Sequence, residues 1–231
     1  AKGETFRHQA YREYKAGRQP APDAFKIQLP LIKELVALLG LPPLEIEGVE
    51  ADDVIASAAL RAATSGIEAS ILTADKDLMQ ILAPGIRVIR PSKGVSDFKV
   101  YDAETFIEEY GFPPQAFVDY LALVGDKVDN VPGVPGIGDK RASSLLREYG
   151  SVEGIFEHLN ELPSSLKEKI EPLRDRILES RGLMKLEADL PVEVESFLPK
   201  EPDIEGLKAL CRKLGLKKLA ERLKIEIDDP K

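Results

Sequence analysis

Carboxylates form three short clusters in this chain, and each cluster borders apolar sequence. The members are Glu50, Asp52 and Asp53, then Asp75 and Asp77, then Asp126 and Asp129. Like charges this close raise one another's pKa and destabilise a fold unless something neutralises them. Mg²⁺ and Mn²⁺ do this with carboxylate and water oxygens alone. The three clusters together predict a site for hard divalent cations.

Two such ions about 4 Å apart could stabilise the attacking and leaving oxygens of a phosphodiester. A simpler explanation exists for each acid by itself, because first-turn Asp and Glu often cap helices or face the helix dipole. For Asp52 alone or Asp75 alone, capping is the better interpretation. The recurrence of three clusters favours the metal site.

The spacing within each cluster predicts how its side chains are placed. Glu50 and Asp53 are three residues apart and would share a helix face. Asp75 and Asp77 are two apart at the end of an apolar strand, so we expect them to point the same way. Ligands of open α/β sheets bind at the carboxyl ends of such strands.

A glycine-rich segment, "VPGVPGIGDKRASSLL" at 131–146, leads directly into a helix. Glycines let a backbone approach a ligand closely, and first-turn amides bind anions. The pattern is typical of a helix–hairpin–helix that holds a DNA phosphate, although a plain interhelical turn is the alternative. The candidate DNA-binding residues are Gly133, Gly136, Ile137, Gly138, Lys140 and Arg141.

A basic segment at 4–18 mixes cations with aromatic rings, and we interpret it as a basic helix or mobile arm. Cations contact phosphates and rings stack on unpaired bases. The residues concerned are Arg7, Tyr11, Tyr14, Lys15 and Arg18. Considered alone, this segment is better interpreted as a solvated basic helix.

The order of expected elements predicts an α/β fold. Strands are expected at 44–47, 68–75, 86–90 and 98–102, the last two as a hairpin or edge pair. Helices are expected at 25–40, 50–66, 76–83 and 102–111. This alternation predicts a mostly parallel central sheet with helices on both faces.

Beyond Pro113 the pattern becomes helical, which predicts a second, all-helical subdomain. Helices are expected within 113–125, 138–150, 151–159 and 163–188, followed by an extended segment at 189–197 and a helix at 203–215. We therefore divide the chain into a 1–112 core, a 113–188 DNA-binding subdomain and a 189–231 segment whose end resembles a linker.

Composition excludes several classes of protein. The 231 residues contain no apolar run of the roughly 18 residues that a membrane span needs. The single cysteine, Cys211, cannot form an internal disulfide, which favours a cytoplasmic location. The net charge of −8 conceals separate basic and acidic segments. No oligomerisation signal stands out, so we expect a monomer.

These motifs resemble a known family. "FRHQAYREYKAGR", "VEADDVIA", "ILTADKDLMQIL" and "GDKVDNVPGVPGIGDKRASSLL", in this order, are similar to the 5′ nuclease (5′–3′ exonuclease, flap endonuclease) domain of bacterial DNA polymerase I, especially its Thermus-like branch. The resemblance extends over essentially the whole chain. It implies a PIN-like nuclease core with a helix–hairpin–helix subdomain.

The resemblance implies a phosphodiesterase with two Mg²⁺ or Mn²⁺ ions that acts on 5′ flaps, nicked or gapped duplexes and RNA primers in replication and repair. The carboxylates of all three clusters would be ligands, directly or through water. Lys15 and Arg18 would steer the scissile phosphate, with Tyr14 stacking near it. The hairpin would hold duplex DNA, often with a K⁺ ion.

Family members have two further strands, ending in Asp-Gly and Phe-Asp, that each supply a metal ligand. By resemblance these would lie in about 70 residues upstream of Ala1. A separate N-terminal fragment could supply them, and a polymerase could follow Lys231. The alternatives are a DNA-binding module without catalysis and a PIN-like ribonuclease, which usually lacks the hairpin and arch motifs.

Overall fold

The computed structural model describes residues 3–92 and 97–226, so the predicted linker start at 228–231 lies outside the described residues. The chain divides into two compact units. The first contains Ala1–Arg18 and Ile46–Val192, and the second contains Gln19–Glu45 and Glu193–Lys231. Each unit therefore combines two segments that are distant in the sequence.

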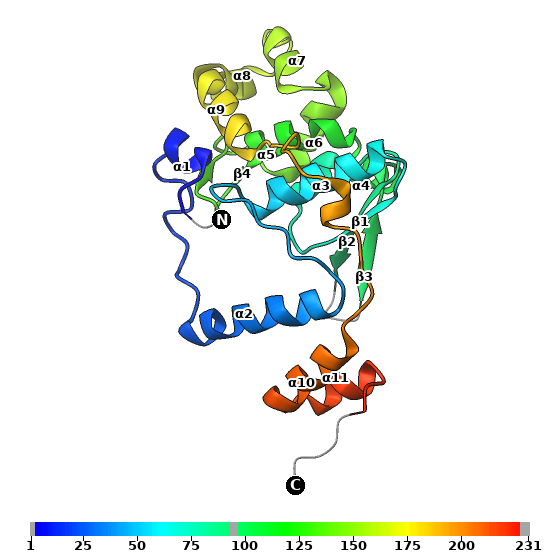
Figure 1. The fold of residues 1–231 in the computed structure, drawn as a ribbon. Coiled ribbons are helices and arrows are strands. Elements are labelled where there is room, and N and C mark those ends of the chain that lie inside the picture. Colours follow the sequence, from blue (N-terminus) through cyan, green and yellow to red (C-terminus); the bar gives the residue numbers. More distant parts are fainter. Residues whose placement is uncertain (1–2, 93–96, 227–231) are drawn as a thin grey trace. The chain divides into compact units, whose positions relative to one another are not determined.

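The sheet of the first unit has the order β1-β2-β3 (Figure 1). Its strands are β1 (Ala69–Leu72), β2 (Ile86–Pro91) and β3 (Phe98–Tyr101). β1 and β2 are parallel with Ile71 opposite Val88, and β2 and β3 are antiparallel with Val88 opposite Tyr101. The expected hairpin or edge pair is confirmed.

The strand predicted at 44–47 is wrong. This segment has no regular structure and runs across the boundary between the two units at Glu45 and Ile46. Its alternating sequence resembles a strand, but a strand also needs a neighbour for its backbone hydrogen bonds. Within the described residues, the sheet of the first unit pairs only β1, β2 and β3.

Helices α3 (Ala51–Thr64) and α4 (Ala103–Tyr110) confirm the predictions for these segments. Small residues at Ala56, Ala59 and Ala62 give α3 a buried face that packs against β1. Asp102 caps α4 through the Thr105 amide at 2.8 Å, and Gly111 ends it with φ +81°. The helix predicted at 76–83 forms only a 3₁₀ segment, Asp77–Ile81.

The rest of the first unit is mainly helical, as expected. Its elements are η2 (Pro114–Ala116), α5 (Phe117–Val124), the two-residue strands β4 (Gly125–Asp126) and β5 (Val131–Pro132), α6 (Asp139–Tyr149), α7 (Val152–Glu157), α8 (Ser164–Ile170), η3 (Glu171–Leu173) and α9 (Arg174–Met184). α5 packs against α6 and α9. Phe106 of α4 and Phe117 of α5 are in edge-to-face contact, so one hydrophobic core joins sheet and helices.

The second unit contains α2 (Asp23–Leu38), η4 (Val194–Ser196), α10 (Ile204–Leu214) and α11 (Lys217–Arg222). Its core consists of Leu207, Cys211, Ala220 and Ile225, against which Leu38 and other residues of α2 pack. Gly40 is required here, because a Cβ on it would lie 2.0 Å from the Lys200 carbonyl oxygen.

The helix predicted at 25–40 is confirmed as α2, and Pro30 lies inside it. The extended segment predicted at 189–197 forms no strand and includes the 3₁₀ turn η4. In the ranges that the structure describes, no helix combines the length and the apolar character that crossing a bilayer requires.

Candidate metal and nucleic-acid site

The basic segment at 4–18 folds onto the first unit instead of extending as an arm. Helix α1 covers only Phe6–Ala10, and residues 12–17 form successive turns. Lys15 adopts φ +58°, and its amide donates to the Asp129 carbonyl at 3.0 Å. Tyr14 is only 4% exposed. The prediction of a mobile or solvated basic helix is therefore wrong in this structure.

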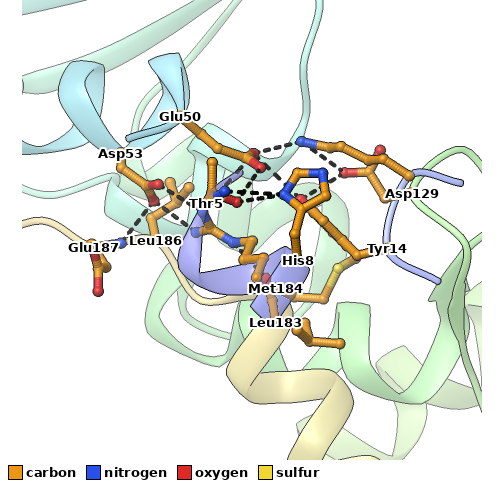
Figure 2. A network of polar contacts seen from close by, with 12 residues as sticks. Thr5, His8, Tyr14, Glu50, Asp53, Asp129, Leu183, Met184, Leu186 and Glu187 are labelled. Atoms are coloured by element: carbon orange, nitrogen blue, oxygen red, sulfur yellow. Dashed lines mark hydrogen bonds and ion pairs between the residues drawn. The ribbon is translucent and has the colours of Figure 1, made fainter. Parts of the chain in front are cut away.

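The turns of this segment bring cations to two of the predicted ligands, Glu50 and Asp129. Figure 2 shows these two acids on either side of Tyr14 and His8. The Lys15 Nζ lies 2.5 Å from Glu50 and 3.6 Å from Asp129. Arg18 donates to Asp129 at 2.5 Å. Glu50 and Asp129, which are 79 positions apart in the sequence, are thus brought together and neutralised by side chains of the protein itself.

Tyr14 lies between the same two carboxylates. Its hydroxyl donates to Asp129 at 3.1 Å and to Glu50 at 3.3 Å. Burial, followed by the charges of Glu50 and Asp129, raises the pKa of Tyr14 well above its ordinary value. The phenol is therefore a neutral hydrogen-bond donor at any physiological pH.

Arg7 is buried, 2% exposed, and its guanidinium holds Asp53 with two hydrogen bonds of 2.6 and 2.7 Å. Burial alone would lower the pKa of Arg7, but the hydrogen bond and the charge of Asp53 raise it. The expectation that Arg7 contacts DNA is wrong in this structure, because its side chain is inside. Asp53 is likewise engaged and does not face the other ligands as an open carboxylate.

Sequence reasoning missed two residues of this network, Thr5 and His8. Thr5 precedes α1, its hydroxyl lies 2.9 Å from His8 Nδ1, and it donates to Glu50 at 3.4 Å. The His8 ring meets Tyr14 edge-on with centroids 5.3 Å apart. The signal was a Thr three positions before a polar residue, which is the spacing of a capping box.

The carboxylates of the second and third clusters form hydrogen bonds with nearby backbone amides. Asp75 and Asp77 follow β1, and the Asp77 amide donates to Asp75 Oδ1 at 2.9 Å. Asp126 accepts from the amides of Val128 at 2.7 Å and Asp129 at 3.3 Å. In both clusters an aspartate therefore fixes the local turn by accepting from an amide two or three residues further along the chain.

Asp75 acts on both Asp52 and Asp77, and the nearby cations Lys15 and Lys76 offset this repulsion only in part. Burial, then the charge of Asp75, raises the pKa of Asp52. The same causes raise the pKa of Asp77 to about 7. Asp77 Oδ1 is buried and has no hydrogen-bond partner. Oxygen donors with unsatisfied lone pairs and residual repulsion suit a hard divalent cation.

The geometry limits how such an ion would be held. Within residues 3–92 and 97–226, no group of three or more His, Cys, Asp or Glu side chains could hold a metal ion as it stands. Mg²⁺ usually binds through one or two carboxylates and keeps several waters. The donor set therefore fits a hydrated ion better than a closed protein cage.

The predicted hairpin forms a tight turn between α5 and α6. A Cβ on Gly133 would meet the Val124 carbonyl oxygen at 2.2 Å, so this position has to be glycine. Ile137 is buried and anchors the turn. Gly136, Gly138, Lys140 and Arg141 line a surface hollow, and Arg141 donates to the Gly136 carbonyl at 2.9 Å.

One residue outside the predicted set, Tyr120, supports the hairpin region, and Tyr11 is the remaining predicted residue. Tyr120, which sequence reasoning missed, donates to Asp139 in the first turn of α6 at 2.6 Å. Tyr11 is partly buried, and its hydroxyl donates to Glu13 at 3.3 Å. Tyr120 was hidden in an apolar run, where an aromatic residue is expected only to fill the core.

Two family models match the chain. "5'-3' exonuclease, N-terminal resolvase-like domain" matches residues 1–111, and "5'-3' exonuclease, C-terminal SAM fold" matches residues 112–205. The 5'-3' exonuclease of Aquifex aeolicus is 41% identical over 229 residues, which are 96% of this chain and 75% of that protein.

A second kind of relative is longer. The thermostable DNA polymerase I of Thermus thermophilus is 47% identical over 214 residues, which cover 93% of this chain and 25% of that protein. The chain thus spans about a quarter of the length of these polymerases.

Solved structures share the fold. The T5 5'-exonuclease with bound zinc has a TM-score of 0.66 at 20% identity, covering 96% of this chain and 80% of that one. The catalytic core of Rad2 in complex with DNA has a TM-score of 0.61 at 18% identity, covering 98% and 78%. The shared architecture is a PIN-like α/β core with a SAM-like helical domain.

Proposed function

Because this chain belongs to the 5'-3' exonuclease family, whose members are metal-dependent nucleases that hydrolyse DNA, we propose that it carries a structure-specific 5′ nuclease site. Its substrates are 5′ flaps, nicked or gapped duplexes and RNA primers on DNA. The proposal rests on two groups of side chains in the first unit. One consists of carboxylates that form no ion pair with the part of the protein that the structure describes, Asp52, Asp75 and Asp77, and the other is a cation group, Lys15 and Arg18.

The open carboxylates would hold the ions. Asp52, Asp75, Asp77 and Asp126 are the proposed ligands of two Mg²⁺ or Mn²⁺ ions, with water completing their coordination. Burial supports this role, because Asp77 Oδ1 lacks any partner from the protein. The ions would supply Lewis-acid stabilisation and a water of lowered pKa at the scissile phosphate.

The cation group would position the phosphate. Arg18 is the most accessible member, with its side chain 49% exposed, so it can reach a phosphate without leaving a buried position. Lys15 and the neutral Tyr14 hydroxyl already lie beside Glu50 and Asp129. Their pairing with these two acids keeps both cations at the site until substrate and ions compete for the carboxylates.

The hairpin would hold duplex DNA without reading its sequence. Gly136 and Gly138 have no side chain of their own to cover the backbone, so a phosphate could approach its amides. Lys140 and Arg141 add positive charge at the start of α6. A K⁺ ion held by backbone carbonyls would fit the same turn. We propose that the 113–188 part grips duplex DNA and also contributes Asp126 to the cleavage site, whose other proposed ligands lie in the 1–112 part. The protein would act as a cytoplasmic monomer associated with a polymerase.

The direct test is a cleavage assay on a labelled 5′-flap DNA. With Mg²⁺ we expect cleavage near the branch, and with the ion removed by a chelator we expect cleavage to stop. Tight flap binding without cleavage at any Mg²⁺ or Mn²⁺ concentration would contradict the nuclease proposal. It would favour a second candidate, a sequence-independent DNA-binding module, which is motivated by the lack of a preformed ion cage in the described residues.

Gly138→Ala tests the duplex grip. A Cβ at Gly138 would meet nothing within 4 Å of the protein, so the thermal midpoint should remain unchanged. The methyl group would instead occupy the space in front of the first turn of α6, where a phosphate would lie. We expect duplex affinity to fall about tenfold in a fluorescence titration, a loss of about 1.4 kcal/mol. Unchanged affinity would place the duplex elsewhere.

A further inference from the structure

The guanidinium of Arg7 joins three segments of the first unit that are distant in the sequence. Its Nη1 and Nη2 donate to Asp53 of α3, its Nε donates to the Leu183 carbonyl at 2.8 Å, and its Nη2 also donates to the Lys185 carbonyl at 2.8 Å. Figure 2 shows Asp53 next to Glu187, with Leu183 further down in the same view. Arg7 thus connects α1, the start of α3 and the end of α9.

Asp53 has little capacity left for a metal ion. Its Oδ1 accepts from Arg7 at 2.7 Å and from the Glu187 amide at 2.9 Å, and its Oδ2 accepts from Arg7 at 2.6 Å. The residue is 1% exposed. A divalent ion at this carboxylate would have to displace a buried guanidinium or lie beside it, and both are strongly unfavourable.

Asp52, the neighbour of Asp53 in the first turn of α3, has the opposite surroundings. Burial and then the charge of Asp75 raise its pKa, and the charge of Lys15 offsets this only in part. Two adjacent acids therefore have different environments: Asp53 is satisfied by the protein, and Asp52 is not. The sequence alone does not distinguish these two acids, because both lie in the segment "EADD".

We infer that Arg7 and Asp53 form a positioning pair for the 5′ nuclease site, and that Asp53 does not ligate the ions. The pair holds the first turn of α3, from which Glu50 and Asp52 project toward the site. Since α1 leads directly into the turns that carry Tyr14, Lys15 and Arg18, the same contact fixes the cation group relative to the carboxylates. This inference rests on the proposed function only for the test that measures cleavage rates.

The test compares Asp53→Asn with Asp52→Asn, using Mn²⁺ titration by calorimetry on the full chain. Asp52→Asn should weaken Mn²⁺ binding at least tenfold because it removes the charge of a ligand. Asp53→Asn keeps the Oδ1 acceptor for Arg7 and for the Glu187 amide and should change the affinity less than about threefold. Asp53→Asn weakening Mn²⁺ as strongly as Asp52→Asn would overturn the inference. This readout does not depend on cleavage, so it stands even if the proposed nuclease activity fails.

The kinetic readout separates positioning from binding. Arg7→Lys keeps the charge but loses the two-pronged geometry, and we expect kcat on a 5′ flap to fall about 10- to 100-fold with KM unchanged. A change confined to KM would instead mean that Arg7 contacts DNA. If Asp53→Asn fails to fold, the double variant Arg7→Gln/Asp53→Asn, which removes both charges together and leaves a neutral amide pair, carries the same Mn²⁺ comparison.

Discussion

Gly133→Ala is expected to lower the free energy of unfolding by about 3 kcal/mol. The new Cβ would lie 2.2 Å from the Val124 carbonyl oxygen, 2.3 Å from its carbon and 2.6 Å from the Gly125 amide nitrogen. All three are backbone atoms at the end of α5, so no side chain can rotate to relieve the overlap. Urea denaturation followed by circular dichroism measures the change.

The matched control is Gly182→Ala in α9. A Cβ there meets nothing within 4 Å, and alanine favours a helix interior, so this variant should be neutral or stabilised by about 0.5–1 kcal/mol. Equal denaturation midpoints for Gly133→Ala and the wild type would refute the close approach of α5 and the hairpin. Because Asp126 directly follows Gly125, a folded Gly133→Ala protein should also bind Mn²⁺ more weakly.

Asp77→Asn is expected to stabilise the metal-free protein and to remove its stabilisation by Mg²⁺. Burial and Asp75 raise the pKa of Asp77 from 3.8 to about 7. The folded state therefore holds a proton that the unfolded state loses, and this carboxyl costs stability progressively as pH rises from about 4 to about 7. The full cost above pH 7 is on the order of 4 kcal/mol.

Thermal unfolding in chelator at pH 4.5 and pH 8 measures this effect. Asp77→Asn should match the wild type closely at pH 4.5 and melt well above it at pH 8. Asp175→Asn, an exposed acid of α9, serves as the control and should shift neither midpoint. An Asp77→Asn protein that melts below the wild type at pH 8 would show that a protein partner satisfies this carboxylate.

Local sequence signals were sufficient to predict an element wherever its own residues determine where it begins and ends. Helix α4 is an example, because Asp102 caps its start and Gly111 ends it, and both are readable without any tertiary contact. The segment at 44–47 shows the limit. Its alternation is the same as that of a strand, but pairing partners are supplied by the rest of the fold and not by the segment.

The sequence predicted that carboxylates would occur in clusters. It did not predict which of them pair with a cation of the protein, as Glu50, Asp53 and Asp129 do, and which do not. Residue types and the order of strands and helices placed the acids near one another. Whether a given acid meets a cation depends on how residues 12–17 turn, and on the unusual φ of Lys15 in particular. Arg7 shows the same limit, since its partners on α3 and after α9 are 46 to 178 positions away.

The discontinuous second unit has a consequence for protein synthesis. Roughly 165 residues separate Leu38, where α2 ends, from Ile204, where α10 begins. At about 5–20 residues per second, a ribosome needs on the order of 10–30 s between the two helices. During this interval the apolar residues of α2 that later contact Leu207 and Cys211 lack these partners. The nascent chain is therefore expected to be a substrate for chaperones that hold exposed apolar helices, until the C-terminal segment emerges.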